Sequence, residues 1–153
     1  MIRYSDPDRD TRAAARRKAN AEHSQLVRDV REELADEPDL VLWVNPRGVA
    51  TFADASGVVR RRVDYGLAKG ASDILGILAI KIGYGEARWP DYALGRFIAL
   101  EIKTGNATRT KHQRMFQEIV RKLGGFATVI RQRSEAKPAI ARARREASDV
   151  VYE

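Results

Sequence analysis

The sequence predicts a single α/β domain, residues 1–153, in which helices flank a central mixed β-sheet. Three observations carry this prediction. Segments with helical spacing of apolar residues begin and end the chain, and another lies between strand-like runs. Some of these runs are apolar on both faces, as expected for covered strands. Neither a repeat of fixed period nor a Gly/Ser-rich or Pro-rich linker divides the 153 residues, which fit one core.

The expected elements alternate along the chain. They are a helix over 10–36, a strand over 40–44, a hairpin over 49–65 turning at 54–57, strands over 72–78 and 96–103, a helix over 110–123, a strand over 126–130 and a helix over 134–148. Leu26, Val30 and Leu34, four residues apart, form the apolar stripe of the first helix. Residues 83–95 contain Gly, Pro, Trp and Tyr without a clean period, so we expect an irregular excursion there.

Composition favours a polyanionic partner. The chain has 28 Lys and Arg against 21 Asp and Glu, a net charge of +7, and a pI near 10.0. Such a charge attracts nucleic acid through the release of condensed counterions. The absence of cysteine excludes disulfides, thiol catalysis and Cys-ligated zinc, so any bound metal must use oxygen or histidine ligands.

Targeting signals are not expected. No apolar run approaches the length that crosses a bilayer, so we expect no membrane partner. The N-terminal residues are charged and lack the apolar stretch of a secretory signal. The sequence therefore predicts a cytoplasmic protein.

Two acids stand at the ends of apolar strands. Because side chains alternate along a strand, Glu101 and Lys103 share one face, while Ile98, Leu100 and Ile102 share the other. Asp73 opens the apolar run over 74–78, directly after a loop with two glycines. If the two strands are neighbours, the carboxylates of Asp73 and Glu101 come together.

Such a pair predicts a metal site. The carboxylates of Asp73 and Glu101, the Ile102 carbonyl and water form an all-oxygen ligand set that suits Mg²⁺, with Mn²⁺ as a substitute. The compact ammonium charge of Lys103 then suits a position beside a scissile phosphate, where it would orient and deprotonate the attacking water or offset charge in the transition state. The alternative is a Glu101–Lys103 pair on an edge strand, with Asp73 as a turn residue.

The motifs resemble a known family. Residues 65–76 read Tyr-Gly-Leu-Ala-Lys-Gly-Ala-Ser-Asp-Ile-Leu-Gly, residues 97–105 read Phe-Ile-Ala-Leu-Glu-Ile-Lys-Thr-Gly, and a helix from about Gln113 ends at Gly124-Gly125. Over a core of about 22–130 this order is similar to the VRR-NUC domain, a branch of the PD-(D/E)xK nucleases found in repair nucleases and in small phage and bacterial proteins. The resemblance implies a restriction-endonuclease-like core and a Mg²⁺-dependent endonuclease acting on DNA.

The resemblance also assigns roles to particular residues. It implies catalytic roles for Asp73, Glu101 and Lys103, and a further carboxylate from the first helix beside the metal, for which Glu22 is the matching position. Glu22 lies four residues before Leu26, offset from the buried stripe by about 40° of rotation. Gln113 matches the glutamine after the E-x-K strand, although Thr110 and Gln113 also have the spacing of a capping box.

Partners follow from the same resemblance. Small stand-alone relatives resemble Holliday-junction resolvases, which implies branched DNA as substrate and the cytoplasm of a bacterial or phage-infected cell as the location. Paired cuts by so short a chain require a homodimer. The predicted phosphate contacts flank the site: Arg60, Arg61, Arg62, Arg109, Lys111 and Arg114. A non-catalytic nucleic-acid-binding module on the same fold is the alternative.

Overall fold

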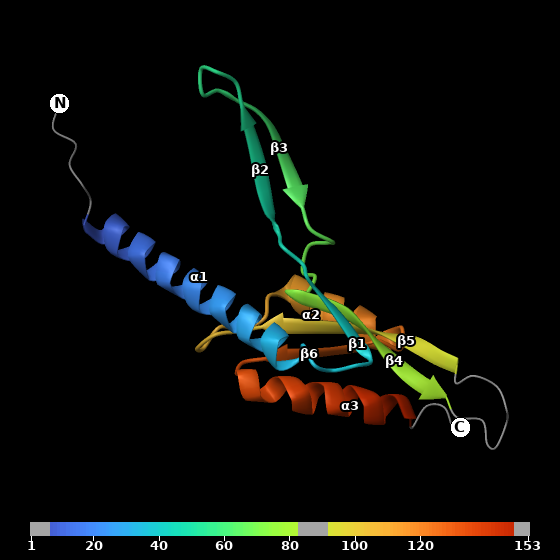
Figure 1. The fold of residues 1–153 in the computed structure, drawn as a ribbon. Helices are drawn as coiled ribbons and strands as arrows, with labels where there is room; N and C mark the ends of the chain where they lie inside the picture. Colours follow the sequence, from blue (N-terminus) through green and yellow to red (C-terminus); the bar gives the residue numbers. More distant parts are fainter. Residues whose placement is uncertain (1–6, 83–91, 149–153) are drawn as a thin grey trace.

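The computed structural model describes residues 7–82 and 92–148. Its elements, in chain order, are α1 (Pro7–Glu33), β1 (Leu40–Val44), β2 (Gly48–Ala53), β3 (Val59–Tyr65), β4 (Ile74–Ile82), β5 (Tyr92–Ile102), α2 (Lys111–Lys122), β6 (Phe126–Ile130), the 3-10 turn η1 (Arg133–Glu135) and α3 (Ala136–Ser148). Figure 1 shows a sheet with helices packed around it and a hairpin that stands away from it. No helix among these described residues is long and apolar enough to cross a membrane.

The central sheet is mixed, as predicted. Its strand order is β1-β4-β5-β6, with antiparallel pairing of β1 with β4 and of β4 with β5. Strands β5 and β6 are parallel, and α2 supplies the crossover between them. The strand that follows Asp73, β4, and the strand that carries Glu101, β5, therefore pair directly in the middle of the sheet.

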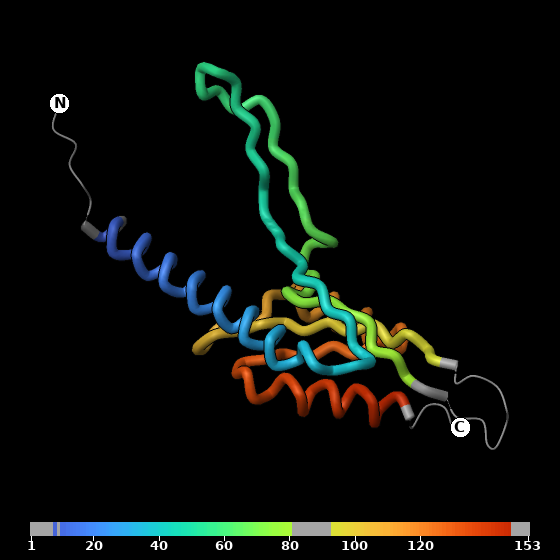
Figure 2. The backbone as a smooth tube through the Cα atoms, in the orientation of Figure 1, coloured from blue at the N-terminus to red at the C-terminus, as the bar shows by residue number. Residues whose placement is uncertain are grey.

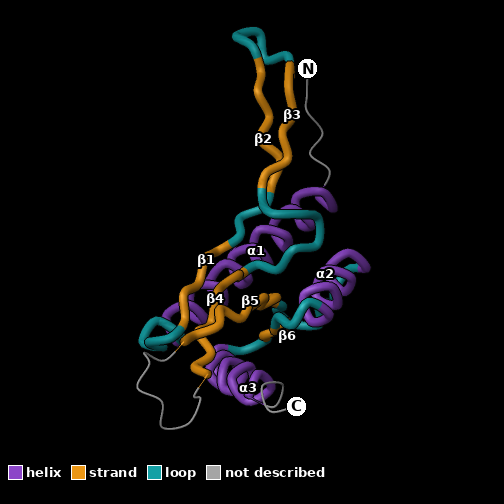
Figure 3. The backbone as a smooth tube through the Cα atoms, turned by 90° about the vertical axis from the view of Figure 1, so that its right-hand side faces the viewer, coloured by secondary structure: helices purple, strands orange, loops and turns teal. Residues whose placement is uncertain are grey.

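Helices cover the two faces of the sheet unequally. On one face, Val30 of α1, Leu34 just after it and Ile140 of α3 pack in a core cluster with Ile98 and Leu100. Each such buried side chain contributes roughly 1.5–3 kcal/mol through the apolar surface removed from water. On the other face, α2 packs on β5 and β6, opposite α3 (Figure 3). The alternation predicted for β5 is confirmed, because Ile98, Leu100 and Ile102 enter one core cluster and Ala99 the other.

The hairpin β2–β3 is a separate two-stranded sheet that projects from the body (Figures 1 and 2). Its turn forms where the sequence predicts. The Asp54 carboxylate accepts hydrogen bonds from the backbone N–H groups of Ser56 and Val58, and Gly57 has a φ of +82°, which glycine adopts without steric cost. The first half of α1 also extends beyond the sheet (Figure 2).

Several boundaries differ from the expectation. Helix α1 ends at Glu33, three residues before the predicted end at residue 36. The predicted excursion over 83–95 is wrong for residues 92–95, which belong to β5 and pair with residues 79–82 of β4. Pairing with an already formed strand imposes the extended conformation there, although the local sequence has no strand period. Residues 83–91 lie outside the described residues, and so does that part of the predicted excursion.

Candidate active site

The antiparallel pairing of β4 and β5 brings Asp73 beside the end of β5. Ile74, the first residue of β4, lies opposite Leu100. One Asp73 oxygen, Oδ2, accepts a 2.8 Å hydrogen bond from the backbone N–H of Ile102. Asp73 therefore lies next to Glu101 and Lys103, the arrangement expected if the two strands were neighbours.

Glu101 is a fully buried carboxylate, with a relative exposure of 0%. Its Oε1 accepts from Lys103 Nζ at 2.9 Å and from Gln113 Nε2 at 2.5 Å. Its Oε2 is buried and has no hydrogen-bond partner among the described residues. Burial, and then the charge of Asp73, raise the pKa of Glu101, whereas Lys103 opposes this rise. A buried oxygen without a partner is costly, so this atom is available to a ligand.

Gln113 joins the start of α2 to Glu101. Its backbone N–H donates to Thr110 Oγ1, and its Oε1 accepts from the Thr110 backbone N–H at 2.8 Å, which completes the predicted capping box. The same side chain donates through Nε2 to Glu101. Gln113 is thus both a helix cap and a neighbour of the site.

The structure places His23, and not Glu22, against Asp73. Glu22 is exposed and forms no hydrogen bond or ion pair within the described part of the chain. His23 Nε2 lies 3.5 Å from Asp73 Oδ1, and the hydrogen bond between these side chains raises the pKa of His23. The physical reason is helical phase. His23 lies seven residues before Val30 and so within about 20° of the buried stripe, whereas steps of four carry Glu22 away from it.

The oxygen atoms at this edge fit a divalent metal that keeps several waters. The part of the chain that the structure describes has no group of three or more His, Cys, Asp or Glu side chains gathered as a metal site. Two carboxylates nevertheless suffice for Mg²⁺, which is usually bound through one or two of them. Glu101 supplies the unpartnered Oε2. The Ile102 carbonyl points to the β4 side, as its N–H does, just beyond the first residue of β4.

Asn45 is a site residue that the sequence interpretation missed. Its side chain donates to the Ser72 carbonyl at 3.1 Å and accepts from the Leu67 N–H at 3.1 Å. Its backbone N–H donates to the Asp73 carbonyl at 2.8 Å. Asn45 therefore fixes the segment that carries Asp73. The only local signal was a turn at Asn45-Pro46, because all three partners are distant in sequence.

A close approach of two backbones ties the Asp73 segment to α2. Gly70 has a φ of +91°, and a Cβ there would lie 2.4 Å from the backbone carbon and oxygen of His112. Only glycine allows this contact without strain. The glycine loop before Asp73 therefore rests on the same helix start that holds Glu101.

Half of the six predicted phosphate contacts have partners within the protein. Arg60 pairs with Asp54 at 2.7 Å. Arg109 donates to Gln117 Oε1 at 2.6 Å, and Arg114 donates to the Arg109 carbonyl at 2.7 Å. These three guanidinium groups hold the hairpin turn and the loop before α2.

The other three predicted contacts are better placed to bind a ligand. Arg61, Arg62 and Lys111 are exposed, and no hydrogen bond or ion pair occupies their side chains in the described segments. Arg61 and Arg62 lie on the projecting strand β3, and Lys111 begins α2.

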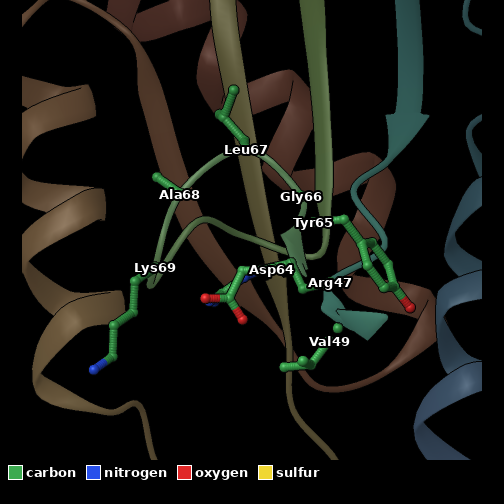
Figure 4. Close-up of a pocket in the computed structure, with 9 residues that line it drawn as sticks. Arg47, Val49, Asp64, Tyr65, Gly66, Leu67, Ala68 and Lys69 are labelled. Atoms are coloured by element: carbon green, nitrogen blue, oxygen red, sulfur yellow. The ribbon is translucent and has the colours of Figure 1, made fainter. Parts of the chain in front are cut away.

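A hollow of about 620 Å³ lies at the base of the hairpin. Figure 4 shows that the side chains of Tyr65, Leu67 and Lys69 around it point in different directions. Neither Asp73 nor Glu101 lines it. Because functional groups do not converge there, the acidic edge of the sheet remains the better candidate site.

Comparison of the chain with models of known protein families and with curated protein sequences yields no match. The assignment of a function therefore rests on the residues and their geometry.

Proposed function

We propose that this chain is a metal-dependent endonuclease that hydrolyses DNA phosphodiester bonds at Asp73, Glu101 and Lys103. The observation that carries the proposal is the fully buried Glu101, whose Oε2 has no partner within residues 7–82 and 92–148 while Asp73 and Lys103 lie beside it. A carboxylate buried with one oxygen unused is costly unless a cation occupies the site. The resemblance to the VRR-NUC domain points to the same chemistry.

Each residue has a role that follows from its position. Asp73 and Glu101, with the Ile102 carbonyl, would hold Mg²⁺, or Mn²⁺ in its place. When bound, such an ion polarises a phosphate oxygen and lowers the pKa of water. Lys103 offsets negative charge that develops on the phosphate. Gln113 orients Glu101, and His23 orients Asp73 from α1.

The proposal extends to a homodimer that cuts branched DNA in the cytoplasm of a bacterial or phage-infected cell. Support for a dimer comes from an uncovered part of the sheet, here called the bare sheet face: Val41, Trp43, Ile77 and Phe97. These side chains are 55%, 52%, 45% and 38% exposed. Val41, Ile77 and Phe97 are cross-strand neighbours, and α2 packs on β5 and β6 beside them. A contiguous apolar patch of this kind marks interaction surfaces.

The decisive experiment is cleavage of labelled linear, flap, fork and four-way-junction DNAs with Mg²⁺, Mn²⁺ or EDTA. We expect metal-dependent cleavage, and at least a ~100-fold loss in Glu101→Gln and in Lys103→Met. The chain offers a matched control in Glu118 and Lys122 on α2, a Glu–Lys pair of 3.1 Å that is exposed. Glu118→Gln and Lys122→Met should cleave normally.

Two outcomes would overturn the proposal. Cleavage that persists in EDTA or in Glu101→Gln would remove the site from the reaction. Tight binding of every DNA without cleavage would instead favour the non-catalytic binding module. Light scattering tests the dimer separately, because Ile77→Glu places a charge in the bare sheet face and should yield monomers. A wild-type chain that is monomeric at all concentrations would contradict the dimer alone.

A further inference from the structure

A groove of about 450 Å³ runs between α1 and the connection from β1 to β2, and Asp73 lies in its wall. Three guanidinium-bearing residues line it: Arg28 and Arg31 from α1 and Arg47 from the connection. His23, which contacts Asp73, lines it as well. The groove thus joins a basic wall to the candidate active site.

Helical spacing explains why these side chains meet there. Ser24, Arg28 and Arg31 follow one another at intervals of four and three residues, so they form one row on the surface of α1. This row lies beside the buried stripe that fixes α1 on the sheet, which includes Val30. The orientation of the two arginines is therefore set by packing of the helix.

Within the described residues, the arginines of the groove lack the acidic partners that arginines on the α3 side have. On the α3 side, Arg133 pairs with Glu33 at 2.7 Å and Arg144 with Glu37 at 2.6 Å. Within the described residues, by contrast, Arg28, Arg31 and Arg47 form no ion pair, and the one side-chain hydrogen bond among them joins Arg28 to the Gln25 amide.

Three guanidinium groups around one groove repel one another unless an anion lies between them. The forked guanidinium matches phosphate oxygens better than an ammonium does. The Asp73 carboxylate is the only acidic side chain in the described lining. The charge of the groove is thus complementary to a chain of phosphates that passes the acidic edge.

We propose that this groove holds the sugar–phosphate backbone of a nucleic-acid strand, with Arg28, Arg31 and Arg47 on the phosphates next to the one that meets Asp73 and Glu101. This inference rests on the proposed nuclease function and adds the path of the substrate. Contacts of this kind position a strand without reading its bases. The proposal places the main contacts with the nucleic-acid backbone on α1 and the β1–β2 connection, in addition to contacts on the hairpin and at the start of α2.

The test measures binding in EDTA, so that no cleavage intervenes. The affinity of a fluorescent DNA duplex and of the matching single strand is followed by anisotropy over a series of KCl concentrations. The variants are Arg28→Gln/Arg31→Gln and, on a different element, Arg47→Gln. The matched control, Lys122→Gln/Arg145→Gln, removes the same two charges from exposed positions on α2 and α3.

Each phosphate contact contributes about 0.9 to the slope of log K against log salt for a duplex, and about 0.7 for a single strand. The double groove variant should therefore flatten the duplex slope by about 1.8, and Arg47→Gln by about 0.9. The control pair should leave the slope unchanged.

Equal losses in the groove and control variants would show that net charge alone matters and would overturn the groove. So would slopes of the groove variants that match the wild type. Because these binding measurements need no metal, their outcome does not depend on whether the chain cleaves DNA. DNA cleavage with unaltered binding by the groove variants would refute only the groove, whereas flattened slopes in a chain that never cleaves would refute only the nuclease.

Discussion

Two substitutions at the start of α2 should separate the stability of the helix from the function of the site. Thr110→Ala removes the hydroxyl that accepts from the Gln113 N–H, but it leaves the Gln113 amide on Glu101. Gln113→Glu does the reverse. It keeps an acceptor for the Thr110 N–H, as glutamate does in capping boxes, and replaces the donor to Glu101 with a second carboxylate oxygen.

Thr110→Ala should change the stability of the fold, whereas Gln113→Glu should change metal affinity and activity. Loss of an N-cap hydroxyl costs about 1 kcal/mol, which lowers the melting temperature of a domain of this size by about 2–4 °C. In Gln113→Glu, two carboxylates in contact cannot both ionise, so the pKa of Glu101 rises further. Loss of an outer hydrogen bond to a metal ligand typically reduces metal affinity or activity by about 10–100-fold.

The assay pairs thermal melts with cleavage rates and Mn²⁺ titrations for both variants. Thr110→Ala should melt earlier and cleave at the wild-type rate. Gln113→Glu should lose metal affinity and cleavage by at least about tenfold. If Thr110→Ala impaired cleavage as strongly as Gln113→Glu does, the role of Gln113 would be confined to building the helix, and the link to Glu101 would be refuted.

Three further predictions concern the surroundings of the site. Asp73→Asn should abolish Mn²⁺ binding in calorimetry while DNA affinity is kept, because the amide loses the charge that the metal needs; an unchanged isotherm would exclude Asp73 as a ligand. Gly70→Ala should destabilise the fold by about 2 kcal/mol or more, since φ is +91° and His112 blocks a Cβ; a melt like that of the wild type would contradict this. Arg133 lowers the pKa of Glu33 from its ordinary 4.5, so the stabilisation is present above pH 4.5 and disappears as the pH falls through the lowered pKa. Arg133→Gln should thus lower the melting temperature at pH 7 and lose its effect in acid, whereas a pH-independent deficit would indicate lost packing instead.

Local patterns were sufficient for most of the fold. The predicted strands over 40–44 and 126–130 match β1 and β6, because each is a short β-type run with a turn signal or glycines beside it. The pattern placed Glu101 beside Asp73 only on the condition that their strands are neighbours, and the antiparallel pairing of β4 with β5 meets this condition.

The rest depended on phase and on tertiary contacts. The choice between Glu22 and His23 as the neighbour of Asp73 depends on the rotation of α1 about its axis. The two-turn spacing from His23 to Val30 indicates that these two residues lie on the same side of the helix. The hydrogen bonds by which Asn45 holds the Asp73 segment were not predictable, because their partners are separated by 22 and 27 positions in the sequence. The exposure of Trp43 on the bare sheet face likewise depends on where the helices pack, because α2 covers β5 and β6 beside it.

The projecting hairpin affects how the chain tolerates a break. A two-stranded ribbon without a covering layer is marginally stable in water, so β2 and β3 open at little cost compared with the core, and their amides exchange rapidly with solvent. Trypsin should therefore cut readily at Arg61 or Arg62. The two fragments would stay together, because β1 precedes the cut, β4 follows it, and the two strands are paired from Leu40–Leu78 to Val44–Ile74. Asp73 would remain held by Asn45 across the break, so the covalent link through the hairpin is dispensable for the geometry of the site.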